Sequence, residues 1–394
     1  MKKYNYLIIG GGMTADAAVK GIREIDSKAT IGVISSDSDP PYDRPPLTKS
    51  LWKDKPLDSV WRHTEKSNVE MHLGRSITAI DVRRNSVTDD KGEVYSYDKL
   101  LLATGGSPRR LPFGGDDIIY FRTLQDYRRL RDLTTKGKSF AVIGGGFIGS
   151  ELAAALAMNH NDVFMLFPGK AICDRIFPAD LSQFLNDFYQ QKGVKVLKGE
   201  RVGSVERKGG RLVLKTASLG ELAVDGIVAG LGIEPNLDLA KKAGLETADG
   251  VVVDELLRTS QPNIYAAGDV AFFYNPALGR RIRVEHEDNA NSMGRIAGRN
   301  MAGTNEPYQH LPFFYSDLFE LGYEAVGELD ARLSTVTDWK EPHREGVIYY
   351  QKEGQVRGVL LWNVWGQVDA ARELIASKRP FQSEELKHKL PKAA

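Results

Sequence analysis

Two stretches of the chain, 6–34 and 140–167, share one pattern of apolar and polar positions. Each begins with a short apolar run, passes through three glycines into an alanine-rich segment, and ends in a second apolar run. Short apolar runs bounded by glycines are typical of buried strands, and the alanine-rich segments favour helices. The pattern therefore predicts strand, turn, helix and strand in succession, and it predicts this unit twice.

The segments that follow the two units are also alike. Strand-like segments follow the first unit and end at Thr104-Gly105-Gly106, and similar segments follow the second unit and end near Gly232. A further buried strand is predicted at 263–270, followed by a helix from about 289 to 301. Beyond about residue 310 aromatic residues become dense, and strand-like segments precede one more helix, which predicts a separate α+β domain.

The glycines of both units follow the fingerprint of dinucleotide-binding turns. The fingerprints are Gly10-x-Gly12-x-x-Ala15 and Gly144-x-Gly146-x-x-Gly149. The first glycine permits the tight turn, the second lets backbone N–H groups approach a pyrophosphate, and the third small residue lets helix and strand pack closely. The helix N-terminus then faces the phosphates with its partial positive charge. Two such fingerprints predict two nucleotide sites, and FAD with NAD(P)H is the pair best suited to exchange electrons.

Composition and charge narrow the function classes. At 394 residues the chain suits two or three domains. The formal charge of +1 gives no general attraction to nucleic acid, and no apolar run approaches the roughly 20 residues that span a bilayer. We therefore expect a cytoplasmic protein with no nucleic-acid partner, no membrane span and no metal site. Cys173 is the only cysteine, so an internal redox disulfide is impossible.

Several further motifs resemble those of one flavoprotein family, the class I pyridine-nucleotide oxidoreductases. These motifs are Pro41–Lys49 (PYDRPPLTK), Ala103–Arg109 (ATGGSPR) and Ala267-Gly268-Asp269. Within the family the chain is most similar to oxygenase-coupled ferredoxin and rubredoxin reductases and to apoptosis-inducing-factor-like proteins. The segments that resemble the last group especially are 279–286, 322–327 and 358–363. The resemblance covers nearly the whole chain.

The resemblance implies an α/β fold with two Rossmann-like domains of the glutathione-reductase type and a C-terminal α+β domain. The FAD-binding domain would be discontinuous and would span 1–112 and 236–309. The NAD(P)H-binding domain would span 113–235, and the C-terminal domain, 310–394, would serve as an interface or dimerisation domain. The protein would be a monomer or a homodimer.

The resemblance also implies roles for individual residues along the FAD. The residues expected to contact FAD are Gly10, Gly12, Met13, Thr14, Ala15, Ser36, Asp37, Arg44, Lys49, Ile77, Ala103, Thr104, Gly105, Arg109, Asp269, Glu285, His286 and Tyr315. Lys49 would lie near flavin N5 and pair with Glu151, because each charge would be costly to bury alone. His286 could donate a hydrogen bond to the flavin, although a structural histidine fits the sequence nearly as well. Lys49, Glu151 and His286 are the candidate catalytic residues.

A second set of residues is implied for NAD(P)H. This set consists of Gly144, Gly146, Phe147, Ile148, Gly149, Glu151, Lys170, Arg175, Gly232 and Glu324. Rossmann folds that bind NAD usually place an acid at the end of the second strand, where it accepts the ribose hydroxyls. Here Gly169 stands in that place and the cations Lys170 and Arg175 follow, so the sequence leaves the choice between NADH and NADPH open.

These features predict an FAD-dependent NAD(P)H oxidoreductase that passes electrons to an external acceptor without a redox disulfide. The favoured acceptor is a small iron–sulfur electron-transfer protein such as a ferredoxin or rubredoxin. One alternative is an apoptosis-inducing-factor-like NADH sensor that forms a flavin–nicotinamide charge-transfer complex and acts through oligomerisation and partner binding. Another alternative is a quinone or oxygen reductase.

Overall fold

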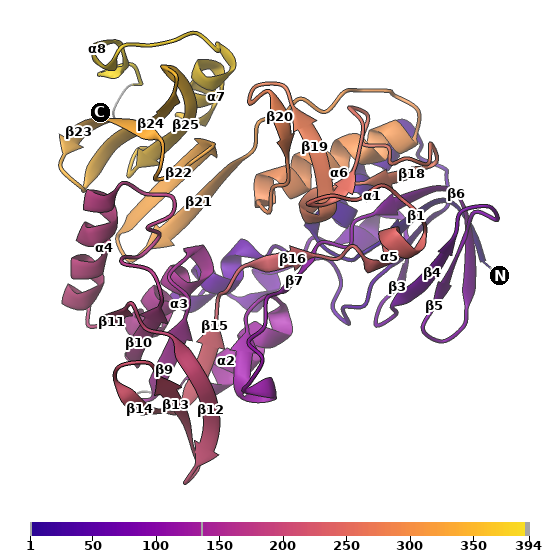
Figure 1. Ribbon diagram of the computed structural model, residues 1–394. Helices are drawn as coiled ribbons and strands as arrows, with labels where there is room; N and C mark the ends of the chain where they lie inside the picture. Colours follow the sequence, from indigo (N-terminus) through magenta and orange to yellow (C-terminus); the bar gives the residue numbers. More distant parts are fainter. Residues whose placement is uncertain (1, 135–136, 391–394) are drawn as a thin grey trace. The chain divides into compact units, whose positions relative to one another are not determined.

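The computed structural model describes residues 2–134 and 137–390, which fall into two compact units. The first unit comprises Met1–Arg44, Leu57–Ser107 and Glu234–Phe314, and the second comprises Pro45–Pro56, Pro108–Ile233 and Tyr315–Ala394. Figure 1 colours the chain along its sequence, so that the alternation between the two units can be followed. Residues 1, 135–136 and 391–394 of the predicted domains lie outside the described residues, and the domain boundaries stay a prediction.

A largely parallel sheet forms the centre of the first unit. Its strand order is β3-β2-β1-β6-β5-β4, and β18 also pairs with β6. The strands are β1 (Lys2–Ile9), β2 (Ile31–Ile34), β3 (Glu70–His72), β4 (Ile77–Asp81), β5 (Ser86–Asp89), β6 (Val94–Leu102) and β18 (Ile264–Ala266). The pairs β3-β2, β2-β1, β1-β6 and β6-β18 are parallel, whereas β4, β5 and β6 pair in antiparallel fashion. The parallel pairing of β1 and β2 requires a crossover between them, which the predicted helix supplies.

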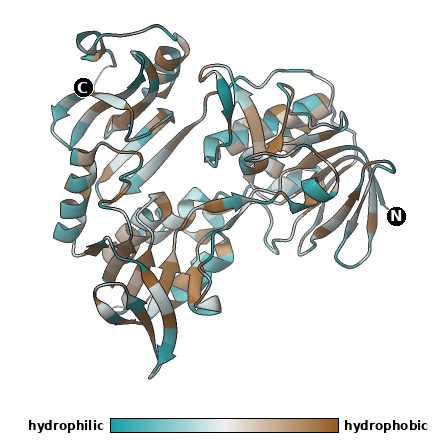
Figure 2. Ribbon diagram, viewed as in Figure 1, coloured by the Kyte–Doolittle hydropathy of each residue, from teal (hydrophilic) through white to brown (hydrophobic). Residues whose placement is uncertain are grey.

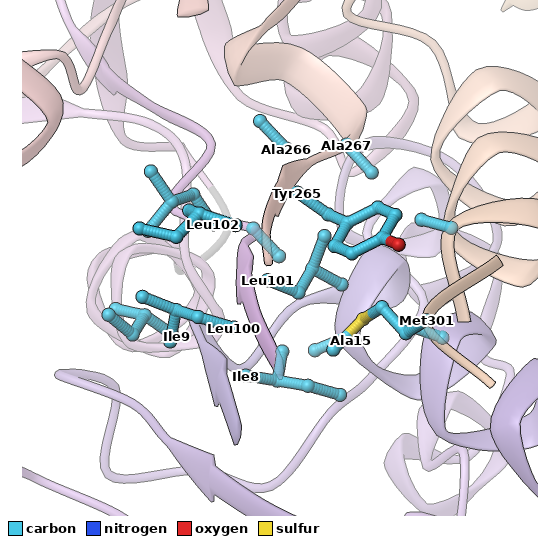
Figure 3. Packing of buried hydrophobic residues seen from close by; sticks show 14 of the residues in the cluster. Ile8, Ile9, Ala15, Leu100, Leu101, Leu102, Tyr265, Ala266, Ala267 and Met301 are labelled. Atoms are coloured by element: carbon cyan, nitrogen blue, oxygen red, sulfur yellow. The ribbon is translucent and has the colours of Figure 1, made fainter. Parts of the chain in front are cut away.

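Two helices of the first unit, α1 (Met13–Ile25) and α6 (Glu287–Met301), pack closely against each other. The approach depends on glycine, because a Cβ at Gly298 would lie 2.1 Å from the Ala18 carbonyl oxygen. Figure 3 shows the adjoining core, in which Leu101 of β6, Tyr265 of β18 and Met301 of α6 lie together. These side chains are buried, so removal of apolar surface from water holds the sheet and the helices together.

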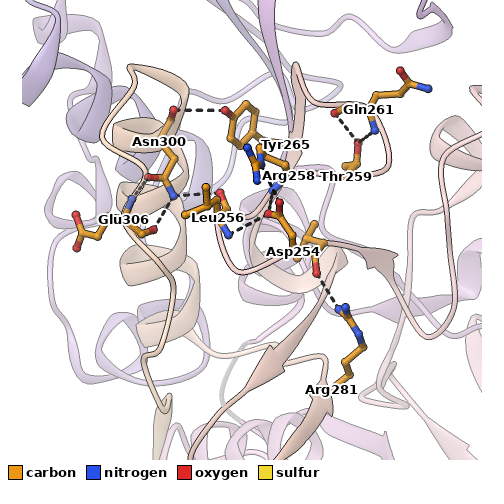
Figure 4. Close-up of polar contacts among 10 residues, drawn as sticks. Asp254, Leu256, Arg258, Thr259, Gln261, Tyr265, Arg281, Asn300 and Glu306 are labelled. Carbon is orange, nitrogen blue, oxygen red and sulfur yellow. Dashed lines mark hydrogen bonds and ion pairs between the residues drawn. The ribbon is translucent and has the colours of Figure 1, made fainter.

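The remaining elements of the first unit are short. They are η3 (Leu57–Val60), η4 (Thr64–Ser67), α5 (Asp238–Lys242), β17 (Val251–Val252), η6 (Gly268–Val270), β19 (Ala271–Asn275) and β20 (Arg280–Ile282). Near the end of α6, Asn300 Nδ2 donates to the carbonyl oxygens of Leu256 and Glu306 at 3.0 and 2.8 Å (Figure 4). Asn300 Oδ1 also accepts from the Glu306 N–H at 2.6 Å. Both ends of the amide are therefore satisfied, and they tie the loop after α6 and the loop between β17 and β18 to the end of this helix.

The second unit contains a parallel sheet of the order β11-β10-β9-β15-β8. Its strands are β8 (Ile118–Tyr120), β9 (Ser139–Ile143), β10 (Asp162–Phe167), β11 (Lys195–Lys198) and β15 (Gly226–Ala229). Its helices are η1 (Pro45–Thr48), η2 (Ser50–Lys53), η5 (Gly115–Asp117), α2 (Leu124–Leu133), α3 (Phe147–Met158) and α4 (Ala179–Gln191). An antiparallel meander, β12 (Val202–Lys208), β13 (Arg211–Thr216) and β14 (Gly220–Val224), is inserted before β15. The order β11-β10-β9 repeats the order β3-β2-β1 of the first unit.

The C-terminal part of the second unit is an antiparallel sheet with two helices. Its strand order is β21-β22-β25-β24-β23. The elements are β21 (Phe313–Leu318), β22 (Leu321–Gly327), β23 (Ser334–Glu341), β24 (Glu345–Lys352), β25 (Gln355–Trp362), α7 (Val368–Ala376) and α8 (Ser383–Leu386). Trp362, Tyr323 and Tyr349 are among its fully buried side chains. Two short strands, β7 (Gly106–Pro108) and β16 (Ile233–Pro235), lie where the chain passes from one unit to the other.

Both predicted strand–turn–helix–strand units are present, and so is the strand-rich C-terminal part. The sequence analysis did not predict the 3-10 turns between 45 and 67 or the hairpin of β19 and β20, because segments this short have no periodicity to recognise. Figure 2 shows hydrophobic residues concentrated on the strands and hydrophilic residues on the loops. Over residues 2–134 and 137–390, no helix combines the length and the apolar character needed to cross a membrane.

Candidate functional site

The first glycine turn lies between β1 and α1. Gly10 has a φ of +117°, and a Cβ there would lie 2.1 Å from the Ala103 carbonyl oxygen. Ala103 donates its N–H to the Ile9 carbonyl oxygen at 2.8 Å, which holds the end of β6 against the end of β1. Because the turn is confined in this way, only a residue without a side chain fits at Gly10.

Gly12 leaves open space in front of α1. It is the N-cap of this helix, it has no side chain to cap the helix, and a Cβ at Gly12 would meet no atom within 4 Å. Gly12 therefore offers the first N–H groups of α1 no side-chain acceptor, and the helix dipole adds positive potential at the same place. A dinucleotide pyrophosphate would supply the missing acceptors, so the residues present fit the predicted FAD.

The first turn of α1 consists of further predicted FAD residues. Met13, Thr14 and Ala15 are buried there, and the third fingerprint position, Ala15, is fully removed from solvent. A Cβ at Gly268 would lie 2.3 Å from Thr14 Oγ1, so Thr14 contacts the segment that carries the buried Asp269. The structure therefore brings Asp269 to the N-terminus of α1, although the two are far apart in the sequence.

The ends of β2 and β6 carry the next predicted residues. After β2, Ser36 is exposed, and Asp37 Oδ2 accepts from the Tyr42 hydroxyl at 3.3 Å. After β6, the Thr104 carbonyl oxygen accepts from Asn236 Nδ2 at 2.8 Å, and the Gly105 carbonyl oxygen accepts from the Asn236 N–H at 3.0 Å. The sequence analysis missed Asn236, which fixes this segment from a distant part of the chain and carries no motif.

Three other predicted FAD residues of the first unit make contacts that do not by themselves indicate a ligand. The Arg44 guanidinium lies 5.3 Å from the centroid of the Tyr42 ring, and Ile77 is the half-buried first residue of β4. The exposed Glu285 forms an ion pair with Arg283 at 2.6 Å. Their roles toward FAD stay a prediction.

His286 is the N-cap residue of α6, which begins at Glu287, two residues before the start predicted near residue 289. Its ring lies 4.3 Å from the ring of Phe314, centroid to centroid. The residue as a whole is partly exposed, but its Nδ1 is shielded from solvent and has no hydrogen-bond partner among the described residues. Burial lowers the pKa of His286 to about 4, so the ring is neutral at pH 7. A buried polar atom without a partner is uncommon in a folded protein, and the role of His286 toward a bound group stays a prediction.

We expect the low pKa of His286 to appear in the pH dependence of stability. The unfolded protein binds a proton on this ring near pH 6.5, whereas the folded protein binds it only near pH 4. The free energy of unfolding therefore decreases as the pH falls through this window. After allowance for partial exposure, the loss attributable to His286 is roughly 2 kcal/mol. Urea unfolding of the wild-type protein and of H286Q, followed across this window, measures it. The loss should shrink in H286Q and persist in H63Q, a change at an exposed histidine of the same unit.

The second glycine turn, between β9 and α3, repeats the geometry of the first. Gly144 has a φ of +124°, and a Cβ there would lie 2.3 Å from the Gly230 carbonyl oxygen. A Cβ at Gly149 would lie 2.1 Å from the Gly144 carbonyl oxygen, whereas Gly146 has no atom within 4 Å. Gly146 is the N-cap of α3 and, as a glycine, has no side chain that could cap this helix. Phe147 and Ile148 follow in the first turn, and the structure therefore fits a second dinucleotide here.

Glu151, one turn further along α3, is the centre of a buried polar cluster. Its carboxylate accepts from Lys49 Nζ at 2.7 Å, from Thr48 Oγ1 at 2.5 Å and from Ser316 Oγ at 2.6 Å. The Lys49 side chain is only 10% exposed and that of Glu151 only 3%. Lys49 Nζ also lies 5.2 Å from the centroid of the Tyr315 ring. The predicted ion pair is present, and its place beside the flavin stays a prediction.

The other predicted residues of the second unit do not join this cluster. Arg109 donates its backbone N–H to the Gly232 carbonyl oxygen at 3.0 Å, so these two predicted residues are neighbours. Glu324 Oε2 accepts from the Gly366 N–H at 3.2 Å, and burial raises the pKa of this carboxyl. Lys170 and Arg175 lie in the exposed part of the loop after β10.

Sequence reasoning missed two partners of Glu151. Thr48 and Ser316 complete the shell of its carboxylate, and each is next to a residue that the sequence analysis did select, Lys49 and Tyr315. No local signal marks either hydroxyl as important, because their role arises only when two distant segments, 48–49 and 316, meet at α3. Across the described residues, no group of three or more His, Cys, Asp or Glu side chains is arranged to hold a metal ion.

The sequence matches the family described as pyridine nucleotide-disulphide oxidoreductase over residues 4–294. It also matches the family described as apoptosis-inducing factor, mitochondrion-associated, C-term over residues 297–345 and 337–377. Apoptosis-inducing factor 1, mitochondrial, of Dictyostelium discoideum is 35% identical, with 98% of this chain and 81% of that protein covered. The ferredoxin–NAD(+) reductase component of the anthranilate 1,2-dioxygenase system of Burkholderia cepacia is 30% identical, with 94% of each protein covered.

A solved structure resembles this one over nearly its whole length. It is the covalent putidaredoxin reductase–putidaredoxin complex, whose matching chain has a TM-score of 0.91 and 27% sequence identity. The match covers 98% of this chain and 95% of the other.

Proposed function

The chain belongs to the pyridine nucleotide-disulphide oxidoreductase family, and on this premise we propose that it passes electrons from NAD(P)H through FAD to a small iron–sulfur protein. The family membership confirms the predicted resemblance, the α/β fold class, the enzyme class and the two cofactors. The protein is an FAD-dependent oxidoreductase that uses NAD(P)H. The identity of the electron acceptor is the part that we propose.

One observation carries the proposal of an external acceptor. Cys173 is the only cysteine of the chain, so electrons cannot pass through an internal dithiol. Burial raises the pKa of the Cys173 thiol to about 12, so the thiol stays protonated and is a poor nucleophile. Electrons that arrive from NAD(P)H must therefore leave for a partner outside the chain.

The likeness to reductases of iron–sulfur proteins supports the choice of partner. The Burkholderia cepacia relative is named as a ferredoxin reductase, and the similar solved structure holds putidaredoxin reductase with putidaredoxin. We propose a ferredoxin or a rubredoxin as the acceptor for this chain.

The residues of the chain serve mainly to bind and orient the two nucleotides. Bound FAD supplies the chemistry, because a flavin accepts a hydride and can release electrons one at a time. The N-terminus of α1 would hold the FAD pyrophosphate, and that of α3 would hold the NAD(P)H pyrophosphate. Asp269 would accept from hydroxyls of FAD, and the neutral His286 could offer a hydrogen bond at the N-terminus of α6.

Rapid mixing separates the candidate functions. We expect NADH or NADPH to bleach the visible flavin absorbance in a stopped-flow experiment, and reduced ferredoxin or rubredoxin to form when the carrier is then added. A flavoprotein that neither nucleotide bleaches would rule out the proposal. Fast reoxidation by a quinone or by oxygen, with no transfer to either carrier, would favour a quinone or oxygen reductase.

A second candidate function is a redox-responsive interaction protein. The match of the C-terminal part to the apoptosis-inducing-factor family, and the 35% identity to the Dictyostelium discoideum protein, favour it. Slow turnover with every carrier, together with a change of oligomeric state on addition of NADH, would support this candidate. Sedimentation of the oxidised and the NADH-reduced protein measures that change.

A further inference from the structure

The end of β10 lacks the acid that the sequence pattern leads one to expect. Gly169 stands in this place, two residues after the last residue of the strand. An acid there usually accepts the adenosine ribose hydroxyls of NAD, and its absence would remove the repulsion that excludes a 2′-phosphate. The two cations in this loop, Lys170 and Arg175, would then favour NADPH.

The structure places another carboxylate at this position. A Cβ added at Gly169 would lie 2.6 Å from Asp174 Oδ2 and 3.1 Å from Asp174 Oδ1. Both carboxylate oxygens therefore lie against the bare backbone of Gly169. A side chain at Gly169 and the carboxylate of Asp174 cannot occupy this place together, so the glycine is what admits Asp174.

The loop that carries Asp174 is held in a defined conformation. Asp174 Oδ2 accepts from the Lys170 N–H at 2.7 Å and from the Ala171 N–H at 3.4 Å. The N–H of Cys173 donates to the Gly145 carbonyl oxygen at 2.8 Å, which ties the loop to the second glycine turn. Asp174 is therefore fixed next to the turn that would bind the NAD(P)H pyrophosphate.

The negative charge of Asp174 is not neutralised within the described part of the chain. The residue is half-buried, and no lysine, arginine or histidine of residues 2–134 and 137–390 forms an ion pair with it. Lys170 and Arg175 are both exposed. Both backbone N–H groups donate to Oδ2, and Oδ1 accepts no hydrogen bond from the described residues.

We propose that Asp174 selects NADH over NADPH in this protein by accepting the adenosine ribose hydroxyls in place of the missing acid at Gly169. The inference rests on the NAD(P)H site of the proposed function, at the turn Gly144–Gly149. A ribose diol donates two hydrogen bonds to a carboxylate, and such charge-assisted bonds are strong. A 2′-phosphate would instead bring a second negative charge against Asp174, and the like charges repel each other.

The proposal is tested by ligands that carry only the adenosine half of the nucleotide. The FAD-loaded protein is titrated calorimetrically with ADP-ribose and with its 2′-phosphorylated form, in the absence of any electron acceptor. We expect the wild-type protein to bind ADP-ribose at least about tenfold more tightly. In D174N, which keeps an oxygen to accept the backbone N–H groups, we expect this ratio to fall about tenfold.

Two further variants make the result specific. D162N makes the same charge change at the exposed first residue of β10, at the opposite end of the strand, and should leave the ratio as in the wild-type protein. The double variant G169E/D174G moves the carboxylate from one position to the other. It should recover the preference for ADP-ribose, because the backbone of residue 174 then leaves room for a side chain at 169.

The outcomes separate this inference from the proposed function. A wild-type ratio near one, a preference for the 2′-phosphorylated ligand, or an unchanged ratio in D174N would overturn the role of Asp174 while the nucleotide site remained. Failure to bind either ligand would overturn the nucleotide site itself, and the inference with it.

Discussion

Glu151→Leu is expected to lower the free energy of unfolding by about 3 to 5 kcal/mol. The substitution leaves the ammonium group of Lys49, which is only 10% exposed, without its counter-ion. It also removes the acceptor for the hydroxyls of Thr48 and Ser316, and an unsatisfied buried donor costs about 1 to 3 kcal/mol. Urea unfolding of the variant and the wild-type protein, followed by circular dichroism, measures the difference.

The double variant K49M/E151L is the control that identifies the cause. If the loss arises from an uncompensated buried charge, removal of both charges should recover most of it, because apolar groups of similar volume replace buried ion pairs at little cost. Glu221 serves as a matched exposed residue, since it pairs with Lys208 and both side chains are about half exposed. E221L should cost less than about 1 kcal/mol. A variant E151L as stable as E221L would contradict a structural role for the pair.

Gly12→Ala is expected to weaken FAD binding by about 100-fold and leave the protein folded. The backbone of Gly12 is extended, with φ −93° and ψ −169°, so alanine adopts it without strain. A Cβ there meets no protein atom within 4 Å. The methyl group therefore occupies only the space in which a pyrophosphate would approach the first N–H groups of α1. The flavin content of the purified protein and its circular dichroism spectrum measure the two effects separately.

Gly10→Ala is the contrasting control for this prediction. Its Cβ would lie 2.1 Å from the Ala103 carbonyl oxygen, and its φ of +117° strains any residue other than glycine. We therefore expect G10A to lose both the flavin and the stability of the folded protein, whereas G12A loses only the flavin. Full flavin content in purified G12A would show that the pyrophosphate does not approach this glycine.

The sequence separation between the residues of each feature explains why some of these residues can be predicted and others cannot. The glycines of one fingerprint lie close together in sequence, as Gly10 and Gly12 do and as Gly144 and Gly146 do. The reason is that a nucleotide turn is built from one strand, one loop and one helix. The Glu151 cluster draws its lysine and one hydroxyl from residues 48–49 and its other hydroxyl from Ser316, far along the chain. Residues of the first kind can be found by spacing, and those of the second kind only by packing.

The sequence by itself determined the two nucleotide turns, the order of the strands and helices around them, and the absence of an internal disulfide. Each of these follows from local patterns: apolar runs, glycine spacing and a count of cysteines. It also indicated the pairing of Lys49 with Glu151, through the family resemblance and the cost of burying either charge alone. These properties can be predicted without knowing which distant segments of the chain come into contact.

Only the tertiary structure decided which groups complete the sites. It brought Thr48 and Ser316 to Glu151, left Nδ1 of His286 without a hydrogen-bond partner in residues 2–134 and 137–390, and placed Asp174 against Gly169. The last contact places a carboxylate at the end of β10, where a missing acid and two nearby cations had left the choice between NADH and NADPH open. The physical reason is that hydrogen bonds and charge act over a few ångströms in space, and a loop of five residues can return a carboxylate to a position that the linear sequence shows as glycine.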